Sequence, residues 1–163
     1  MIETTDAQRF ASKIVRGPGA RDCWIWTGAV GDDGYGRFWT RNTDGAQRMT
    51  RAHRFAFEQL VGDPAQLDGV EVCHTCDNPL CVRAEPGPGS HLYAGDRSRN
   101  MADRAERGRG NTQHAGQFFR AQTRAERARN SRALRDFVRV NGYDAAAVDE
   151  LLGRRGPGQL LLF

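Results

Sequence analysis

The stretch that decides the fold is VEVCHTCDNPLC (70–81), followed after a loop by HLYAGDRSRN (91–100). The alternating valines of the first segment predict a strand that ends at His74. The second segment predicts another short strand and then a helix, which begins at Asp96 and carries Asn100. The order of strand, loop, strand and helix predicts a small compact unit that is built around these two segments.

The cysteines of this unit have the spacing of a metal site. Cys76 and Cys81 are separated by four residues, and His91 follows a loop rich in Gly and Pro. Two thiolates, one imidazole and one further cysteine form the closed tetrahedral site that is typical of structural zinc. The fourth ligand is either Cys23 or Cys73, which the sequence does not separate. The alternative interpretation is that some of these cysteines are only buried thiols.

Length and polarity indicate a small soluble protein. The chain has 163 residues, a mean hydropathy of −0.67 and 27% charged residues, which fits one compact domain with an appendage. No apolar run approaches the length of a membrane span, and the first residues, MIETTDAQRF, lack the pattern of a signal peptide. We therefore expect a cytoplasmic protein without membrane association, in which cysteines stay reduced and serve as metal ligands rather than disulfides.

The basic residues are almost all arginines. The formal net charge is +4, and Lys13 is the only lysine among 24 basic residues. The planar guanidinium group suits phosphates and base edges. A GC-rich genome would give the same bias toward arginine, so composition permits nucleic-acid binding without establishing it.

Upstream of the metal motif the pattern predicts helices and short strands. We expect a helix over 6–16 with Asp6 as its cap, and a tight turn after it. The expected strands and the second helix follow in the order Cys23–Gly28, Tyr35–Arg41, Gln47–Ala52 and His53–Leu60. This half is predicted to be one twisted antiparallel sheet with a short helix.

The C-terminal part has a different composition. Thr123 and Glu126 form a capping box at the start of a predicted helix, and a second helix is expected from Asp144 to Leu152. The first of these helices is rich in arginine. The expected organisation is a domain over 1–110 with the motif at about 70–107, a linker over 111–122, a helical hairpin over 123–153, and a flexible tail over 154–163.

Several motifs together resemble a known family. HTCDNPLC, HLYAG and Asn100, preceded in order by CWIWTG, GYGRF and AHRFAFE, are similar to the His-Asn-His (HNH) endonucleases of the ββα-metal class. The closest similarity is to the zinc-stabilised phage and homing-type subgroup, and it covers roughly residues 10–110. The resemblance implies an α+β fold, with an antiparallel sheet, a zinc-stabilised ββα-metal nuclease core and a C-terminal helical appendage.

The resemblance also implies roles for single residues. His74 would be the general base that takes a proton from the attacking water, and Asn100 would bind a divalent cation, Mg²⁺ being the first candidate. Arg37 or Arg54 would contact the scissile phosphate. The structural zinc ligands would be Cys23, Cys76, Cys81 and His91. The alternatives are that His74 is a further zinc ligand and that Asn100 is only a polar residue of a helix.

One segment departs from the pattern of the family. Residues 84–90, AEPGPGS, lie between the second cysteine of the motif and His91, where the family usually has a shorter connection. A longer loop costs little entropy, so the ligands are still expected to converge.

Arginines next to the core are candidates for contacts with DNA phosphates. Those selected are Arg97, Arg99, Arg104, Arg124 and Arg127. The alternative is a solvated helix on which arginine pairs with glutamate.

The last five residues, QLLLF, resemble the QLxLF peptide by which bacterial replication and repair proteins bind the sliding clamp. Gln159 would make polar contacts, while Leu160, Leu162 and Phe163 would fill an apolar cleft. The alternative is that this peptide folds back on the core or pairs in a homodimer.

The sequence therefore predicts a metal-dependent HNH-type DNA endonuclease that hydrolyses phosphodiester bonds, tethered to a bacterial sliding clamp, in a bacterial or phage-infected cell. Nicking and double-strand cleavage both stay open, as do roles in homing, phage DNA processing and defence. The two rival interpretations are a non-catalytic zinc-containing DNA-binding module and a protein that acts only by binding the clamp.

Overall fold

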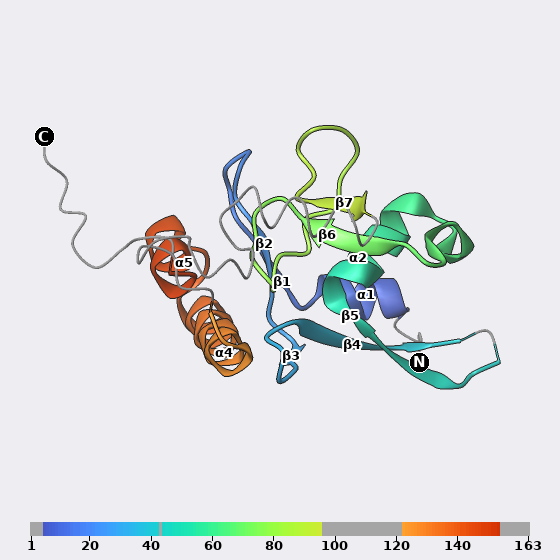
Figure 1. Ribbon diagram of the computed structural model, residues 1–163, viewed down its shortest axis with the longest axis horizontal. Helices are drawn as coiled ribbons and strands as arrows, with labels where there is room; N and C mark the ends of the chain where they lie inside the picture. Colours follow the sequence, from blue (N-terminus) through green and yellow to red (C-terminus); the bar gives the residue numbers. More distant parts are fainter. Residues whose placement is uncertain (1–4, 43, 96–121, 154–163) are drawn as a thin grey trace, which may run out of the picture.

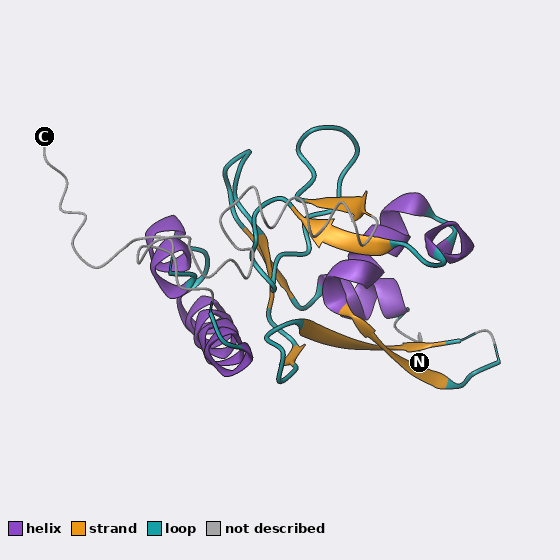
Figure 2. Ribbon diagram, viewed as in Figure 1, coloured by secondary structure: helices purple, strands orange, loops and turns teal. Residues whose placement is uncertain are grey.

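The computed structural model describes residues 5–42, 44–95 and 122–153, and these form a mixed α+β fold (Figure 2). The helices and strands, in chain order, are α1 (Asp6–Ala11), β1 (Ile14–Arg16), β2 (Trp24–Trp26), β3 (Ala29–Val30), β4 (Gly36–Arg41), β5 (Gln47–Arg51), α2 (Ala52–Val61), the 3₁₀ helix η1 (Pro64–Leu67), β6 (Glu71–His74), β7 (Leu92–Gly95), α4 (Arg124–Asn141) and α5 (Ala145–Leu151). No helix of the described residues is long and apolar enough to cross a membrane.

The strands form three small antiparallel sheets, so the prediction of one twisted sheet is wrong. β1 pairs with β2, β3 and β5 flank β4, and β6 pairs with β7. The reason lies at β2: Trp26 N–H donates to Leu80 O, and Val82 N–H donates to Trp24 O, both at 2.8 Å. The free edge of β2 is therefore occupied by the loop that contains Cys76 and Cys81, which we call the cysteine loop. This leaves no edge of β2 with which β3 could pair to extend the sheet.

The first helix is shorter than predicted. Thr5, not Asp6, caps it, because the Thr5 hydroxyl accepts a bond from Gln8 N–H and the Gln8 side chain accepts one from Thr5 N–H. The helix ends at Ala11, and Ile14 and Val15 lie in β1. These β-branched residues are better suited to a pleated strand than to a helix continuation.

The centre of the core is a group of aromatic rings. Phe10 of α1 packs against Trp26, Phe38 and Phe55, with ring centroids 4.8–5.1 Å apart. Trp26 is fully buried. These rings come from α1, β2, β4 and α2, so they hold these four elements together.

The C-terminal helical hairpin packs on this core and shares its apolar cluster. Thr123 and Glu126 form the predicted capping box of α4, and Asp144 caps α5 as expected. Leu134, Val138 and Val148 are almost fully buried. In Figure 1, α4 and α5 lie at one end of the described structure, next to β3 and the β1–β2 pair.

Candidate metal centre and histidine pair

Three cysteines and one histidine form a cluster that could hold a metal ion. The ligand atoms of Cys23, Cys76, Cys81 and His91 all lie within 4.8 Å of one another. His91 Nδ1 is 3.6 Å from Cys23 Sγ and 3.4 Å from Cys81 Sγ. In a tetrahedral zinc site, neighbouring sulfur and nitrogen ligands are separated by about 3.5–3.8 Å, given the usual metal–ligand bond lengths. The cluster therefore has the donor set and the size of a closed structural zinc site.

The cysteine loop is shaped by two residues between its cysteines. Asp77 has a φ of 56°, a left-handed conformation that aspartate adopts more easily than most residues. The side-chain oxygen of Asn78 accepts a bond from Leu80 N–H at 3.0 Å, and its backbone oxygen accepts one from Cys81 N–H at 3.0 Å. This tight turn brings Cys81 back toward Cys76. Asn78 is fully buried.

Cys23 reaches the cluster because backbone hydrogen bonds join β2 to the cysteine loop. Ile25 forms an isolated antiparallel bridge with Cys81. Cys23 lies just before β2, and its backbone N–H donates to the hydroxyl of Tyr143 at 3.3 Å. The fourth member of the cluster is thus Cys23. Cys73 is buried in β6 outside it, with its thiol 3.9 Å from Glu71 O.

Two backbone hydrogen bonds hold His91, which directly precedes β7. Its N–H donates to Arg83 O at 3.0 Å, and its carbonyl accepts from Thr75 N–H at 2.9 Å. The inserted loop 84–90 stands out from the body of the protein (Figure 1). Arg83 anchors the base of this loop by pairing with Glu85 and by donating to Asp22 O at 2.8 Å. The insertion therefore leaves the ligands together, as predicted.

The thiols of the cluster perturb one another. Hydrogen bonds from Cys76 and Cys81 lower the pKa of Cys23 far below its ordinary value, and the Asn78 side chain adds to this effect. The pKa of Cys76 is raised, first because its thiol is hydrogen-bonded to the Cys23 side chain. Burial raises the pKa of Cys81. Three thiolates this close repel one another, and a bound cation removes that repulsion.

His74 lies at the end of β6, directly against the cysteine loop. Its Nε2 is 3.0 Å from the backbone oxygen of Cys81. Since a carbonyl can only accept, Nε2 carries the hydrogen, and in the neutral ring Nδ1 carries the lone pair. Burial lowers the pKa of His74 to about 4, although the bond to Cys81 opposes that shift. The ring is therefore neutral near pH 7 and can accept a proton at Nδ1. His74 is not a member of the metal cluster.

A second histidine lies beside the first, with its ring tilted by 57°. The ring centroids of His53 in α2 and His74 are 4.6 Å apart, and Tyr35 lies 5.3 Å from His53 and 6.2 Å from His74. His53 is 4% exposed, and its Nδ1 has no hydrogen-bond partner within the described structure. Burial, followed by the neighbouring His74, holds the pKa of His53 well below 6.5. The sequence motif AHRFAFE contained this residue, but nothing in the pattern paired it with His74.

An arginine contacts Tyr35, and a second shares its carboxylate partner. Arg51 stacks over the ring of Tyr35 at 4.6 Å and pairs with Asp33 at 2.9 Å. Arg37 pairs with the same carboxylate at 2.9 Å. Tyr35 and Arg51 were not selected from the sequence, because their closeness to His74 depends on how β4, β5 and β6 are arranged.

The other predicted arginines that the structure describes make structural contacts. Arg54 donates to Val70 O and Leu67 O, each at 2.8 Å, and pairs with Glu58. Arg124 pairs with Asp32 at 2.7 Å, and Arg127 donates to Asp33 O at 2.7 Å. The last two therefore dock α4 on the turn before β4. Contacts of Arg37, Arg54, Arg124 and Arg127 with DNA stay predictions.

The remaining predicted residues lie outside the described residues. They are Asn100, Arg97, Arg99, Arg104, Gln159, Leu160, Leu162 and Phe163.

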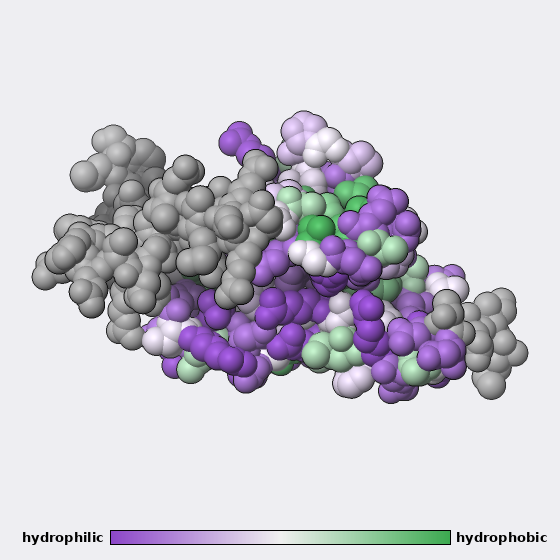
Figure 3. Space-filling model, turned by 45° about the vertical axis from the view of Figure 1, so that its right-hand side comes forward, coloured by the Kyte–Doolittle hydropathy of each residue, from purple (hydrophilic) through white to green (hydrophobic). Residues whose placement is uncertain are grey.

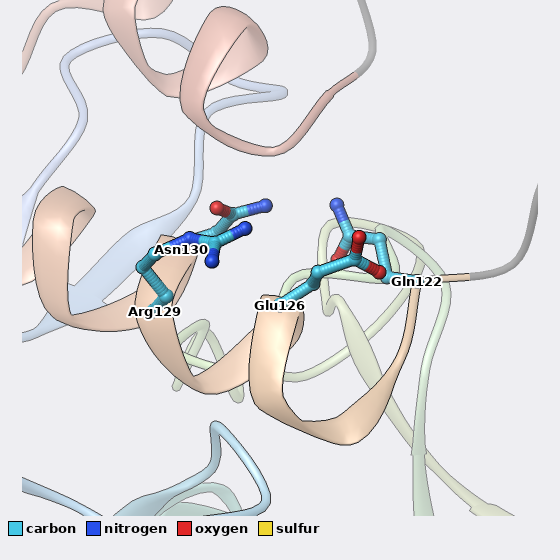
Figure 4. A pocket seen from close by; sticks show the side chains of 4 residues that line it. All are labelled: Gln122, Glu126, Arg129 and Asn130. Atoms are coloured by element: carbon cyan, nitrogen blue, oxygen red, sulfur yellow. The ribbon is translucent and has the colours of Figure 1, made fainter.

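An open depression lies elsewhere, at the beginning of α4 (Figure 4). It is lined by Gln122, Glu126, Arg129 and Asn130. None of the predicted site residues lines it, and Glu126 is the only carboxylate among its lining residues, so we assign it no role.

Comparison with known proteins places the chain near two phage proteins. It is 34% identical over 87 residues to Protein 2.8 of Escherichia phage T7, which covers 53% of this chain and 52% of that protein. It is 35% identical over 88 residues to Protein 7.7 of the same phage, covering 54% and 58%. The chain therefore spans only about half the length of these curated relatives. No family model matches the chain, and no solved structure matches it.

Proposed function

We propose that the protein is a metal-dependent DNA endonuclease of the HNH type, which hydrolyses phosphodiester bonds. The observation that carries the proposal is the placement of His74: a neutral imidazole oriented by Cys81 O, directly beside a separate Cys₃His cluster. A general base has to be held in a defined orientation, and the hydrogen bond to Cys81 O holds His74 in one.

Phosphodiester hydrolysis requires a positioned water, a proton acceptor and stabilisation of the charge that develops on phosphate. In this proposal His74 accepts the proton of the water at Nδ1, and the Nε2–Cys81 bond fixes the ring. Arg51, which lies over Tyr35, and Arg37, which shares Asp33 with it, are the candidate sources of positive charge, although Asp33 takes up part of that charge. Arg54 is the weaker candidate for a phosphate contact, since its donors are engaged by Val70 O, Leu67 O and Glu58.

The two proposed metals have different support. The donor set and spacing of Cys23, Cys76, Cys81 and His91 fit zinc, which would tie the cysteine loop to β2. A catalytic Mg²⁺ would supply charge stabilisation for phosphate. Its proposed protein ligand, Asn100, lies outside the described residues, so that part of the proposal rests on the sequence resemblance alone.

The direct test is cleavage of supercoiled plasmid by the purified full-length protein in the presence of Mg²⁺. Conversion to open-circular or linear DNA, with ends that a ligase can reseal, supports hydrolysis that leaves 5′-phosphate and 3′-hydroxyl groups. Protein that carries zinc and binds DNA but leaves the plasmid supercoiled, across divalent metals, would instead support the non-catalytic DNA-binding module.

A second proposal concerns the tail. The peptide QLLLF (159–163) supports attachment to a bacterial sliding clamp, because its glutamine followed by leucines and a phenylalanine has the composition of a docking motif. Tethering would raise the local concentration of the protein on replicating DNA. Binding of purified clamp that disappears after deletion of residues 159–163 supports this proposal. Binding that is absent, or unchanged by the deletion, contradicts it.

A further inference from the structure

The β4–β5 ribbon has two faces of different character. Facing pairs on the inner side include Phe38 and Thr50, both buried against the core. Side chains alternate along a strand, so the side chains of the pairs directly before and after an inner pair point outward. The outward pairs are Arg37 with Arg51, Trp39 with Met49, and Arg41 with Gln47. We refer to these six residues as the ribbon face.

The ribbon face carries exposed apolar side chains that the fold does not use. Trp39 is 55% exposed and Met49 is 42% exposed, and they sit opposite each other on neighbouring strands. The other two tryptophans are half-buried or buried. Figure 3 shows a largely hydrophilic surface on which apolar residues form small separate groups. An exposed Trp–Met pair bordered by arginines is typical of a contact surface, in which aromatic residues and arginine are enriched.

The charge of the ribbon is positive. Between Gly36 and Arg51 the sequence has four arginines and one acidic residue, Asp44, which lies in the turn. Asp6 lowers the net charge near Arg41, since its carboxylate accepts a hydrogen bond from the Arg41 backbone N–H at 2.9 Å. Asp33 lowers the net charge at the other end of the ribbon, where it pairs with Arg37 and Arg51. The ribbon face itself contains no acidic side chain, which favours an anionic partner over a basic or neutral surface.

The ribbon face is continuous with the histidine pair. Arg51 stacks over Tyr35, and Tyr35 lies 6.2 Å from His74 between ring centroids. From this base the ribbon extends toward the end of the molecule that lies opposite α4 and α5 (Figure 1). A strand of six residues is about 20 Å long. A polymer with its reacting phosphate at His74 would therefore run along the ribbon face.

We propose that the ribbon face binds double-stranded DNA beside the cleavage site, with Trp39 and Met49 covered by the duplex and Arg41 against the sugar–phosphate backbone. A two-stranded antiparallel ribbon has the width to enter the major groove, which is about 12 Å wide. Apolar side chains contact thymine methyl groups and sugars there, while arginines contact phosphates. This inference rests on the proposed nuclease function and names the surface by which the substrate is held.

The test uses the full-length protein, a short duplex and the same oligonucleotide as a single strand, without added magnesium. Because Trp39 is the most exposed tryptophan, iodide quenching of fluorescence reports mainly on its accessibility. We expect saturating duplex to protect the quenchable component, and Trp39→Phe to remove that component. Trp39→Ala combined with Met49→Ala should weaken duplex binding about tenfold, and Arg41→Ala should weaken it by a similar factor.

Arg48→Ala is the matched control. Arg48 lies on the same ribbon but on the opposite face, opposite Thr40 and paired with Glu58, so duplex binding should change by no more than about twofold. Equal quenching of Trp39 with and without bound duplex overturns the proposal, as does stronger protection by the single strand. A wild-type protein that nicks plasmid without protecting Trp39 would refute the ribbon face alone. Protection of Trp39 without any nicking would refute the nuclease and leave the ribbon face standing.

Discussion

The backbone oxygen of Cys81 lies 3.0 Å from Nε2 of His74, while the Cys81 sulfur lies 3.4 Å from Nδ1 of His91. One residue thus belongs to the candidate metal cluster through its side chain and orients the candidate base through its backbone. Any change in the cysteine loop that moves the Cys81 carbonyl also changes the orientation of the His74 ring. Integrity of the metal centre and the geometry of His74 are therefore coupled, even though His74 is not itself in the cluster.

Removing one cluster cysteine should release the metal and destabilise the fold. Cys81→Ser replaces a fully buried thiol of the cluster, so we expect loss of bound zinc and a clearly lower Tm. Cys73→Ser is the control, because Cys73 is also buried but lies outside the cluster. Metal content by mass spectrometry and thermal unfolding measure both effects. Equal zinc content in the two variants would show that the cluster does not bind the metal.

The buried His53 should make stability depend on pH. Its folded-state pKa lies well below 6.5, so the unfolded chain takes up a proton that the folded protein does not. The stability that depends on a neutral His53 ring is fully present above about pH 6.5 and is lost as the pH falls below that value. We expect the free energy of unfolding to fall between about pH 7.5 and about pH 5.5, and to fall less steeply in His53→Phe.

Urea unfolding at a series of pH values measures this dependence, with zinc content followed in parallel. Both proteins carry the same cluster, so loss of metal at low pH affects them alike and the difference in slope isolates His53. An unchanged slope in His53→Phe would contradict the role of this imidazole.

The hydroxyl of Tyr143 connects the C-terminal hairpin to the metal centre. It accepts the Cys23 N–H at 3.3 Å, and burial raises the pKa of Tyr143 to about 12. Tyr143→Phe removes the acceptor of a partly buried N–H and should cost about 1–2 kcal/mol of stability. We expect faster zinc loss to a chelator as well, because Cys23 is held less firmly. Phe137→Leu on α4 is a comparison that alters the packing of the hairpin without touching Cys23. If Tyr143→Phe loses zinc at the wild-type rate, the hairpin does not support the cluster.

Local features were predictable from the sequence and non-local ones were not. The capping box of Thr123 and Glu126, the cap at Asp144, and the grouping of Cys76, Cys81 and His91 follow from short-range spacing. The choice of Cys23 over Cys73 depends on the bonds between β2 and the cysteine loop, across more than fifty residues of chain. The three separate sheets depend on the same bonds, since the loop takes the edge of β2 that a larger sheet would need.

The histidine pair was beyond sequence reasoning for the same reason. His53 and His74 come from α2 and β6, and no periodicity connects them. Likewise, the arginines of α4 gave a pattern suited to DNA, yet Arg124 and Arg127 contact the turn at Asp32 and Asp33. A charged residue chosen from composition alone can serve either a partner or the fold, and only its surroundings distinguish the two.

The central claim is that His74 acts in hydrolysis beside a separate structural metal site. The measurement that tests it most directly is nicking of supercoiled plasmid with Mg²⁺ by the wild-type protein and by His74→Ala, with zinc content determined on the same samples. The account predicts that the wild-type protein nicks, and that the variant loses at least about 100-fold in rate while it keeps its zinc. A variant that nicks at the wild-type rate, or that loses its zinc together with its activity, would contradict the account.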